Sequence, residues 1–313
     1  MKPTLLVLAA GMGSRYGGLK QMDAVGPAGE TIMDYSIFDA ARAGFGKVVF
    51  VIRKDFEQAF HDAFSNRFGG AIEVDFVLQA IDKTPQGCSY NPERTKPWGT
   101  NHAVMMGASA IREPFAVINA DDFYGKESFE VLAKFLGEVA DKKDLYAMVG
   151  YHLSNTLSES GAVSRGICEK SDDGFLLSVV ERTHIERLGG KPAYKDEKGA
   201  LNMLSDNAPT SMNMWGFTPE YFEYSESYFK EFLKENGQNI KSEFFIPYVI
   251  DRLIRSKKAK VKVLDTPAKW FGVTYAEDKP TVIMKINELV HKGVYPENLW
   301  KSRPAGAPCK SHS

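Results

Sequence analysis

The sequence predicts an α/β fold in which helices cover both faces of a mostly parallel sheet, with a smaller antiparallel layer added in the second half. As far as about residue 145, short apolar runs alternate with amphipathic segments, a pattern typical of parallel strands joined by helices. Beyond that point turn signals separate the apolar runs, which indicates antiparallel pairing. No repeat or low-complexity linker divides the chain. We therefore expect one domain over residues 1–295, with halves at about 1–145 and 146–295, and a tail at 296–313.

The first half supplies the parallel elements. Apolar residues spaced three and four apart predict the helices, and compact apolar or β-branched runs predict the strands. The expected strands cover residues 5–10, 47–52, 72–79 and 115–122, and the expected helices cover residues 33–45, 55–68, 103–111 and 127–140.

The second half begins with a strand at residues 145–153 and a hairpin at 161–185 around the turn Ser-Asp-Asp-Gly. A further strand is expected at 210–217. The remaining expected elements are helices at 228–237 and 243–258 and strands at 259–264 and 268–273.

Composition restricts the function classes. The chain has 313 residues, 43% hydrophobic and 25% charged, with a net charge of −1, so its overall charge favours neither a nucleic acid nor a membrane surface as partner. Cys88, Cys168 and Cys309 lie far apart without metal-ligand spacing, as in a reduced cytoplasmic protein. The apolar run at residues 5–10 is too short for a signal peptide core or a membrane span.

A glycine-rich segment, GMGSRYGGLK at residues 11–20, follows the first expected strand. Glycines allow a sharp turn in which backbone N–H groups approach an anion, and Arg15 and Lys20 add positive charge. Together these features suit a polyphosphate. The segment is not a P-loop, because no GKS or GKT follows at the right spacing. It is also a poor match to a dinucleotide-binding turn, because its glycines follow the pattern GxGxxxGG and the second strand ends in Arg53 and Lys54 rather than in an acid.

The residues LAAGMGSRYGGLKQ, at 8–21, resemble the signature loop of the sugar-phosphate nucleotidyltransferases. The resemblance continues through Gln79 with GTNHA at 99–103, AVINADD at 116–122, VVER at 179–182, SMNMWGF at 211–217 and WFGVTYAED at 270–278. It implies a Rossmann-like fold of the GT-A type. It also implies a Mg²⁺-dependent reaction in which an NTP and a sugar 1-phosphate give an NDP-sugar and pyrophosphate. The first half would bind the nucleotide and the second half the acceptor.

The resemblance assigns the nucleotide-binding residues. Arg15 would bind the leaving β- and γ-phosphates, and Lys20 would bridge the α-phosphate and the sugar phosphate, so these two carry catalysis. The backbone of the loop would hold the triphosphate, and the side chain of Gln79 with the turn at 99–100 would read the base. The nucleotide-binding set is therefore Ala10, Gly11, Gly13, Ser14, Gln79, Gly99 and Thr100.

Asp121 ends an apolar strand, where ligands of parallel sheets gather, and a carboxylate there suits Mg²⁺. Asp122 points the other way in an extended chain, so we leave it to turn geometry or a ribose contact. The family closes the metal site with a second aspartate, where Val273 or Thr274 stands here. Asp278 is a second candidate.

The acceptor side is assigned to Glu181, Arg182 and Asn213 by the same resemblance. An ion pair on an edge strand is the alternative reading of the first two. We read His102 as a packing residue or a polar residue near a helix N-terminus. The loop at 80–98 is interpreted as a cover over the nucleotide, a subunit contact or a surface excursion.

Three alternatives to a sugar-phosphate enzyme stay open. The first is nucleotidyl transfer to a non-sugar phosphate such as phosphocholine. The second is a dinucleotide oxidoreductase, which the missing acid after the second strand argues against. The third is a non-catalytic sensor on the same fold, which retention of Arg15, Lys20 and Asp121 argues against. The motifs do not specify the sugar, the base or the oligomeric state.

Overall fold

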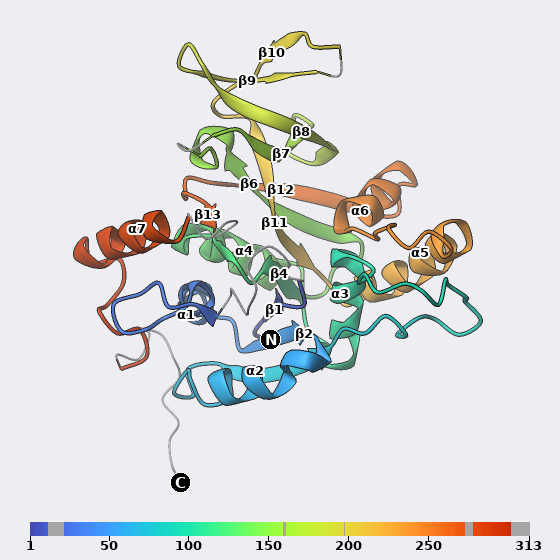
Figure 1. Ribbon diagram of the computed structural model, residues 1–313, viewed down its shortest axis with the longest axis horizontal. Helices are drawn as coiled ribbons and strands as arrows, with labels where there is room; N and C mark the ends of the chain where they lie inside the picture. The colour runs from blue at the N-terminus through green and yellow to red at the C-terminus, as the bar shows by residue number, and fades with distance from the viewer. Residues whose placement is uncertain (12–21, 159–160, 197, 273–277, 302–313) are drawn as a thin grey trace.

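The computed structural model describes residues 1–11, 22–158, 161–196, 198–272 and 278–301. Within them, a twisted sheet of eleven strands runs through the molecule with helices on both faces, and a small two-stranded sheet lies beside it (Figure 1). This mixed sheet confirms the predicted fold class. None of the described helices is long and apolar enough to cross a membrane.

The strands of the main sheet follow the order β10-β9-β8-β7-β11-β4-β1-β2-β3, with β6 paired to β11 and β12 paired to β6. Their bounds are β1 (Thr4–Leu8), β2 (Lys47–Ile52), β3 (Glu73–Leu78), β4 (Phe115–Asn119), β6 (Leu145–His152), β7 (Val163–Lys170), β8 (Leu176–Leu188), β9 (Lys191–Lys195), β10 (Leu201–Met203), β11 (Pro209–Phe217) and β12 (Lys260–Thr266). The two-stranded sheet pairs β5 (Asp122–Phe123) with β13 (Phe271–Gly272).

Strand β1 lies at the centre of the parallel part. It pairs with β2 on one side and with β4 on the other, and Leu8 is opposite both Val51 and Asn119. Because the pairing is parallel and in register, the carboxyl ends of these strands lie at one edge of the sheet. The segments that leave this edge are therefore the ones that build a site.

Helices cover the two faces separately. They are α1 (Ile32–Ala43), α2 (Glu57–Phe64), α3 (Thr100–Met106), α4 (Lys126–Glu138), α5 (Glu220–Asn236), α6 (Ile246–Arg255) and α7 (Lys279–His291). Leu5 and Val7 of β1 pack with α1, α2 and α4, whereas Leu6 packs with α3, α5 and α6. Alternate residues of one strand thus belong to two different cores, as the period of a β-strand requires.

Local sequence signals set the helix ends. Thr31 and Asp34 form a capping box at the start of α1, and Gly44 ends the helix in the left-handed conformation. The helix that we expected from residue 243 begins at Ile246, because Pro247 suits only the first turn and Phe245 is extended. The strand expected at 268–273 pairs over two residues only.

Strand β11 joins the two halves of the sheet. Its first residues lie between β6 and β7, and its last residues lie between β6 and β4. The register shifts between Ser211 and Trp215, and Asn213 in this interval has φ +60°, a conformation that asparagine tolerates better than most residues. The irregularity re-aims the Asn213 side chain at the junction of the two halves.

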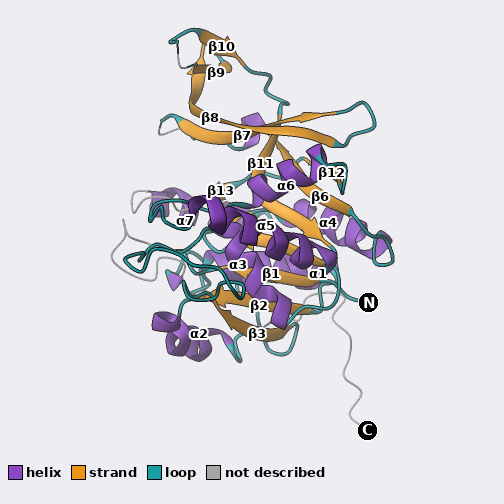
Figure 2. Ribbon diagram, turned by 90° about the vertical axis from the view of Figure 1, so that its right-hand side faces the viewer, coloured by secondary structure: helices purple, strands orange, loops and turns teal. Residues whose placement is uncertain are grey.

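Beyond this junction, strands β7 to β10 project from the body of the molecule as the antiparallel layer (Figure 2). The hairpin expected at 161–185 is formed by β7 and β8. The sequence analysis did not identify β9 and β10. Strand β10 has only three residues, and its two apolar side chains, Leu201 and Met203, are exposed, so it does not have the length or the buried apolar face of a typical core strand.

Candidate functional site

The segments that follow β1, β3 and β4 meet at one edge of the sheet. The backbone N–H of Ala120 donates to the carbonyl oxygen of Leu8 at 3.2 Å, and that of Gln79 donates to Ile52 at 2.8 Å. These hydrogen bonds extend the strand pairing by one residue, so they fix the backbone of Ala120 and Gln79 beside the neighbouring strands. Open α/β sheets bind ligands at this edge.

A cavity of about 350 Å³ lies there, within the size range of small-molecule sites. Among the described residues it is lined by Leu8, Ala10, Gly11, Gln79, Lys96, Pro97, Gly99, Thr100, Ala103, Asn119, Asp121 and Glu243. We call it the strand-end cavity. It gathers six residues that the sequence analysis assigned to the site, which are Ala10, Gly11, Gln79, Gly99, Thr100 and Asp121. Gly13, Ser14, Arg15 and Lys20 lie outside the described residues.

The turn at Gly99 forms one wall of the strand-end cavity. Gly99 has φ +107° and ψ −177°, a region that essentially only glycine occupies. A Cβ at this position would lie 2.9 Å from the carbonyl oxygen of Phe244, so glycine also allows the turn to approach that backbone. Next to it, the Thr100 hydroxyl accepts a hydrogen bond from the N–H of Ile246 at 3.2 Å. The turn is therefore fixed against the segment that begins α6.

Gln79 faces this turn from the end of β3. Its side-chain nitrogen lies 3.3 Å from the carbonyl oxygen of Gly99 and 3.1 Å from Nδ1 of His102. His102 is fully buried in α3, and its Nε2 lies 2.8 Å from the carbonyl oxygen of Lys83. Burial lowers the pKa of His102 to about 4, so the ring is neutral at physiological pH.

Asp121 and Asp122 diverge at the end of β4. Asp121 lines the strand-end cavity, whereas Asp122 is buried and accepts hydrogen bonds from Asn119 Nδ2 at 2.9 Å and from the Tyr124 hydroxyl at 3.3 Å. Burial raises the pKa of Asp122 to about 7, and the neighbouring charge of Asp121 raises it too. Asp121 is thus the carboxylate placed to meet a ligand in the cavity.

The partner of Asp122 in the small sheet is Gly272. A Cβ on Gly272 would lie 2.6 Å from Oδ1 of Asp122, so the carboxylate occupies the space that a side chain at 272 would fill. Val273 and Thr274, where a second metal acid was expected, lie outside the described residues. Asp278 immediately precedes α7 and is not among the described residues that line the strand-end cavity.

The proposed acceptor residues separate in space. Asn213 donates from Nδ2 to Asn119 Oδ1 at 2.7 Å and accepts from Trp215 Nε1 at 2.9 Å, so it is one residue removed from the cavity lining. Glu181 is exposed on β8, and the guanidinium of Arg182 lies 4.8 Å from the ring centre of Tyr194. Neither is among the described residues that line the cavity.

Sequence reasoning missed several polar residues near the site. Lys96 and Glu243 both line the cavity and form an ion pair at 2.6 Å. Asn119 precedes Asp121 by two residues, and this spacing at a strand end could have identified it. Arg165 is half-buried, and its guanidinium lies 4.7 Å from the centre of the Trp270 ring. Burial lowers the pKa of Arg165 to about 10, although the charge of Asp122 opposes this. The sequence around Arg165 carries no signal for such a position.

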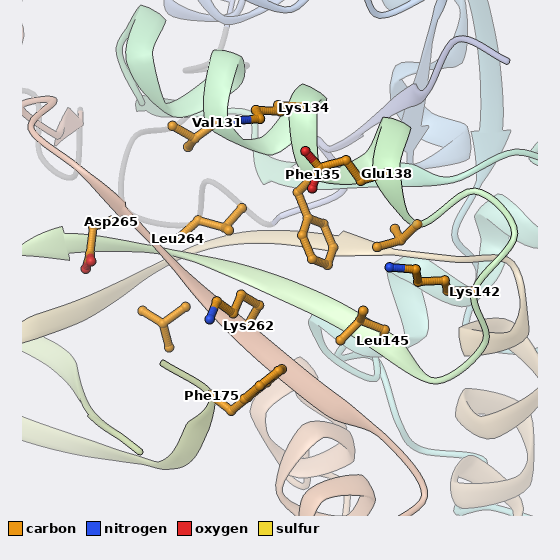
Figure 3. A pocket seen from close by; sticks show the side chains of 12 residues that line it. Val131, Lys134, Phe135, Glu138, Lys142, Leu145, Phe175, Lys262, Leu264 and Asp265 are labelled. Carbon is orange, nitrogen blue, oxygen red and sulfur yellow. The ribbon is translucent and has the colours of Figure 1, made fainter. Parts of the chain in front are cut away.

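A second cavity of about 460 Å³ lies between α4 and β12 (Figure 3). Its wall is formed by apolar residues such as Phe135, Leu145 and Phe175, with Lys134, Lys142 and Lys262 around them. It shares no described residue with the strand-end cavity.

The arrangement of carboxylates and histidines indicates how the site could hold a metal ion. Among the described residues, no three or more His, Cys, Asp or Glu side chains are grouped to hold a metal ion. Mg²⁺, however, is commonly bound by one or two carboxylates together with substrate phosphates rather than by an all-protein cage. Asp121, a hard oxygen donor at the wall of a cavity of nucleotide size, fits that mode.

Comparison with known proteins places these observations in context. The model of the family described as "Nucleotidyl transferase" matches residues 4–284. A UDP-glucose pyrophosphorylase complexed with UDP-glucose superposes with a TM-score of 0.61 at 17% identity, covering 92% of this chain and 99% of that chain. An inositol-1-phosphate CTP transferase from T. maritima superposes with a TM-score of 0.59 at 13% identity, covering 92% and 97%. No curated protein matches the sequence significantly.

Proposed function

Because this chain belongs to the nucleotidyl transferase family, we propose that it transfers a nucleotidyl group from an NTP to a sugar 1-phosphate and releases pyrophosphate. The observation that carries the proposal is the strand-end cavity. Its lining joins a glycine that leaves β1, an amide and a tight turn suited to a base, and an aspartate at the end of β4. A nucleotide placed along this wall would have its base at Gln79 and its phosphates between Gly11 and Asp121.

In the proposed reaction an oxygen of the sugar phosphate attacks the α-phosphorus of the NTP. A new P–O bond forms as the bond to the β-phosphate oxygen breaks, and pyrophosphate leaves with that electron pair. Both reactants are anions, so the site has to neutralise charge and align the attack. We assign this to Arg15 and Lys20 of the glycine-rich segment, with the phosphates held by the backbone of Gly11, Gly13 and Ser14.

Mg²⁺ is the cofactor that we propose, with Asp121 as its protein ligand. When bound, the ion would neutralise phosphate charge and hold the oxygens in position. Asp122 has a different role in this scheme, because its carboxylate is already engaged by Asn119 and Tyr124. It fixes the strand end from which Asp121 projects.

Transfer to a non-sugar phosphate is the second candidate. The structurally similar inositol-1-phosphate CTP transferase is named for an acceptor that is not a sugar. Glu181 and Arg182, which we proposed for sugar contacts, lie on the antiparallel layer and not in the described cavity lining. A small alcohol phosphate would need fewer contacts from that layer.

Pyrophosphate release in the presence of Mg²⁺ tests both candidates. UTP, dTTP, CTP, GTP and ATP are each tested with pooled sugar 1-phosphates, and separately with inositol 1-phosphate and phosphocholine. Release that requires one NTP and one sugar phosphate supports the proposal, and release only with an alcohol phosphate supports the second candidate. Nucleotide binding without release from any pair would contradict both and favour a sensor.

Two variants test the assigned residues. Lys20→Ala and Asp121→Asn should each lower kcat by about 10²–10³-fold, the loss usual for a single electrostatic group. Asp172→Asn, in the exposed turn between β7 and β8, is the matched control and should keep the full rate. Near wild-type rates in either folded site variant would refute its assignment.

A further inference from the structure

The contacts of Gln79 determine which end of its amide meets a ligand. Its side-chain nitrogen lies 3.3 Å from the Gly99 carbonyl oxygen and 3.1 Å from Nδ1 of His102. A carbonyl oxygen can only accept a hydrogen bond. The identity of the second contact depends on the tautomer of His102.

The tautomer follows from the other ring nitrogen. Nε2 of His102 lies 2.8 Å from the Lys83 carbonyl oxygen, so Nε2 must carry a proton and donate. The ring is fully buried in α3 and packs 5.0 Å from the ring centre of Phe229. Burial lowers the pKa of His102 to about 4, which keeps a second proton off the ring. Nδ1 is therefore a bare acceptor.

Two acceptors thus face the same atom of Gln79, and that atom must be the NH₂ group. The reverse orientation would place the amide oxygen against Gly99 O and a bare Nδ1, with both contacts repulsive. Both amide hydrogens are used in the observed orientation, and only Oε1 remains. None of the described residues donates to Oε1, and Gln79 is 8% exposed where it lines the strand-end cavity.

We infer that His102 is a positioning residue that holds the Gln79 amide with its oxygen toward the nucleotide, so that the site selects a base with a ring N–H. The inference rests on the proposed function and deepens it. Uracil, thymine and guanine carry a ring N–H on the pairing edge. The corresponding ring nitrogen of cytosine and adenine is an acceptor, and two acceptors facing each other, this nitrogen and Oε1, would repel. The preferred donor is then UTP, dTTP or GTP.

Kinetics with purified full-length protein test the role of His102. His102→Phe keeps a ring in the core but removes the acceptor, so the Gln79 amide is free to rotate. The KM for the preferred NTP should rise about ten-fold, with a matching loss of preference over CTP and ATP, while kcat and the KM for the acceptor stay unchanged. His102→Asn returns an acceptor oxygen near the Nδ1 position and should restore most of the preference. His61→Phe, an exposed ring packed on Phe76, is the matched control.

The wild-type protein offers a second measurement that needs no variant. The ¹⁵N resonances of the His102 ring should show a protonated Nε2 and an unprotonated Nδ1, before and after the preferred NTP is added. A protonated Nδ1 would overturn the inference, because the amide oxygen of Gln79 would then face the ring.

The outcomes separate the two proposals. If pyrophosphate is released but folded His102→Phe keeps the wild-type preference, or if the wild type prefers CTP or ATP, this inference is wrong and the proposed function stands. If no NTP is turned over with any acceptor, the proposed function fails and the inference fails with it.

Discussion

Substituting Gly99 by alanine tests whether the turn beside the strand-end cavity is built on glycine. Two separate costs arise at this position. The backbone, at φ +107° and ψ −177°, lies in a region that costs other residues about 1–3 kcal/mol. The added Cβ would also lie 2.9 Å from the carbonyl oxygen and 3.0 Å from the nitrogen of Phe244. These are backbone atoms and cannot rotate away.

Overpacking of this kind costs about 1–3 kcal/mol, so Gly99→Ala should lower the free energy of unfolding by about 2–6 kcal/mol. Two other glycines separate the costs. Gly87 has φ +81° but nothing within 4 Å of its added Cβ, so alanine there should cost only about 1–2 kcal/mol. Gly137 is exposed in α4, has an ordinary φ and has no atom within 4 Å of its added Cβ. Gly137→Ala should therefore raise the free energy of unfolding by about 0.5–1 kcal/mol.

Urea denaturation of wild type and the three variants is the assay, and equal m-values allow their free energies of unfolding to be compared. The expected order of stability is Gly137→Ala, wild type, Gly87→Ala and Gly99→Ala. Equal losses for Gly87→Ala and Gly99→Ala would show that the approach to Phe244 imposes no constraint. Wild-type stability in Gly99→Ala would refute the whole argument. If Gly99→Ala stays folded, its KM for the NTP should rise, because the turn must shift away from Phe244.

Three further changes have defined outcomes. Burial raises the pKa of Asp39 to about 7, although its ion pair with Arg42 and the hydrogen bond from the Tyr295 hydroxyl oppose this shift. The folded protein therefore favours the protonated acid and loses stability as pH rises from about 4 to about 7. In urea titrations at each pH, Asp39→Asn should lose less stability than wild type across that window, and parallel curves would contradict this. Arg94 donates hydrogen bonds to three backbone carbonyl oxygens, and its guanidinium lies 3.5 Å from the centre of the Trp98 ring. Arg94→Lys should therefore lower the free energy of unfolding by about 2–3 kcal/mol. Arg255→Lys, at an exposed position, is the control in the same urea titrations. Gly272→Ala should displace the Asp122 carboxylate and cost about 1–3 kcal/mol by thermal or urea unfolding, whereas unchanged stability would show that the carboxylate relaxes freely.

Much of the candidate site could be predicted because its residues are tied to strand ends. Gln79 follows the edge strand β3 and Asp121 follows the buried strand β4, and parallel pairing places the ends of both strands at the same edge of the sheet. Gly99 belongs to a motif whose glycine is required by its backbone conformation. In each case the local sequence contains the physical cause of the position.

The remainder depends on contacts between distant segments. Asn213 reaches Asn119 because β11 changes its register beside two different neighbours, and no local pattern encodes that change. Glu243 approaches Lys96 across 147 residues, through the path of the loop and not through a motif. The loop at 80–98 packs on the body through Trp98 and Arg94, which its many turn residues do not indicate.

The hydrogen bond from the Ile246 N–H to the Thr100 hydroxyl spans 146 residues. Phe245 at the start of α6 provides no side-chain cap of its own, so the first turn of this helix is completed by a residue from the wall of the strand-end cavity. Hydrogen exchange at the Ile246 amide therefore reports on the cavity from outside it. Any event that tightens the turn at Thr100 would slow hydrogen exchange at Ile246, which is not among the described residues that line the strand-end cavity.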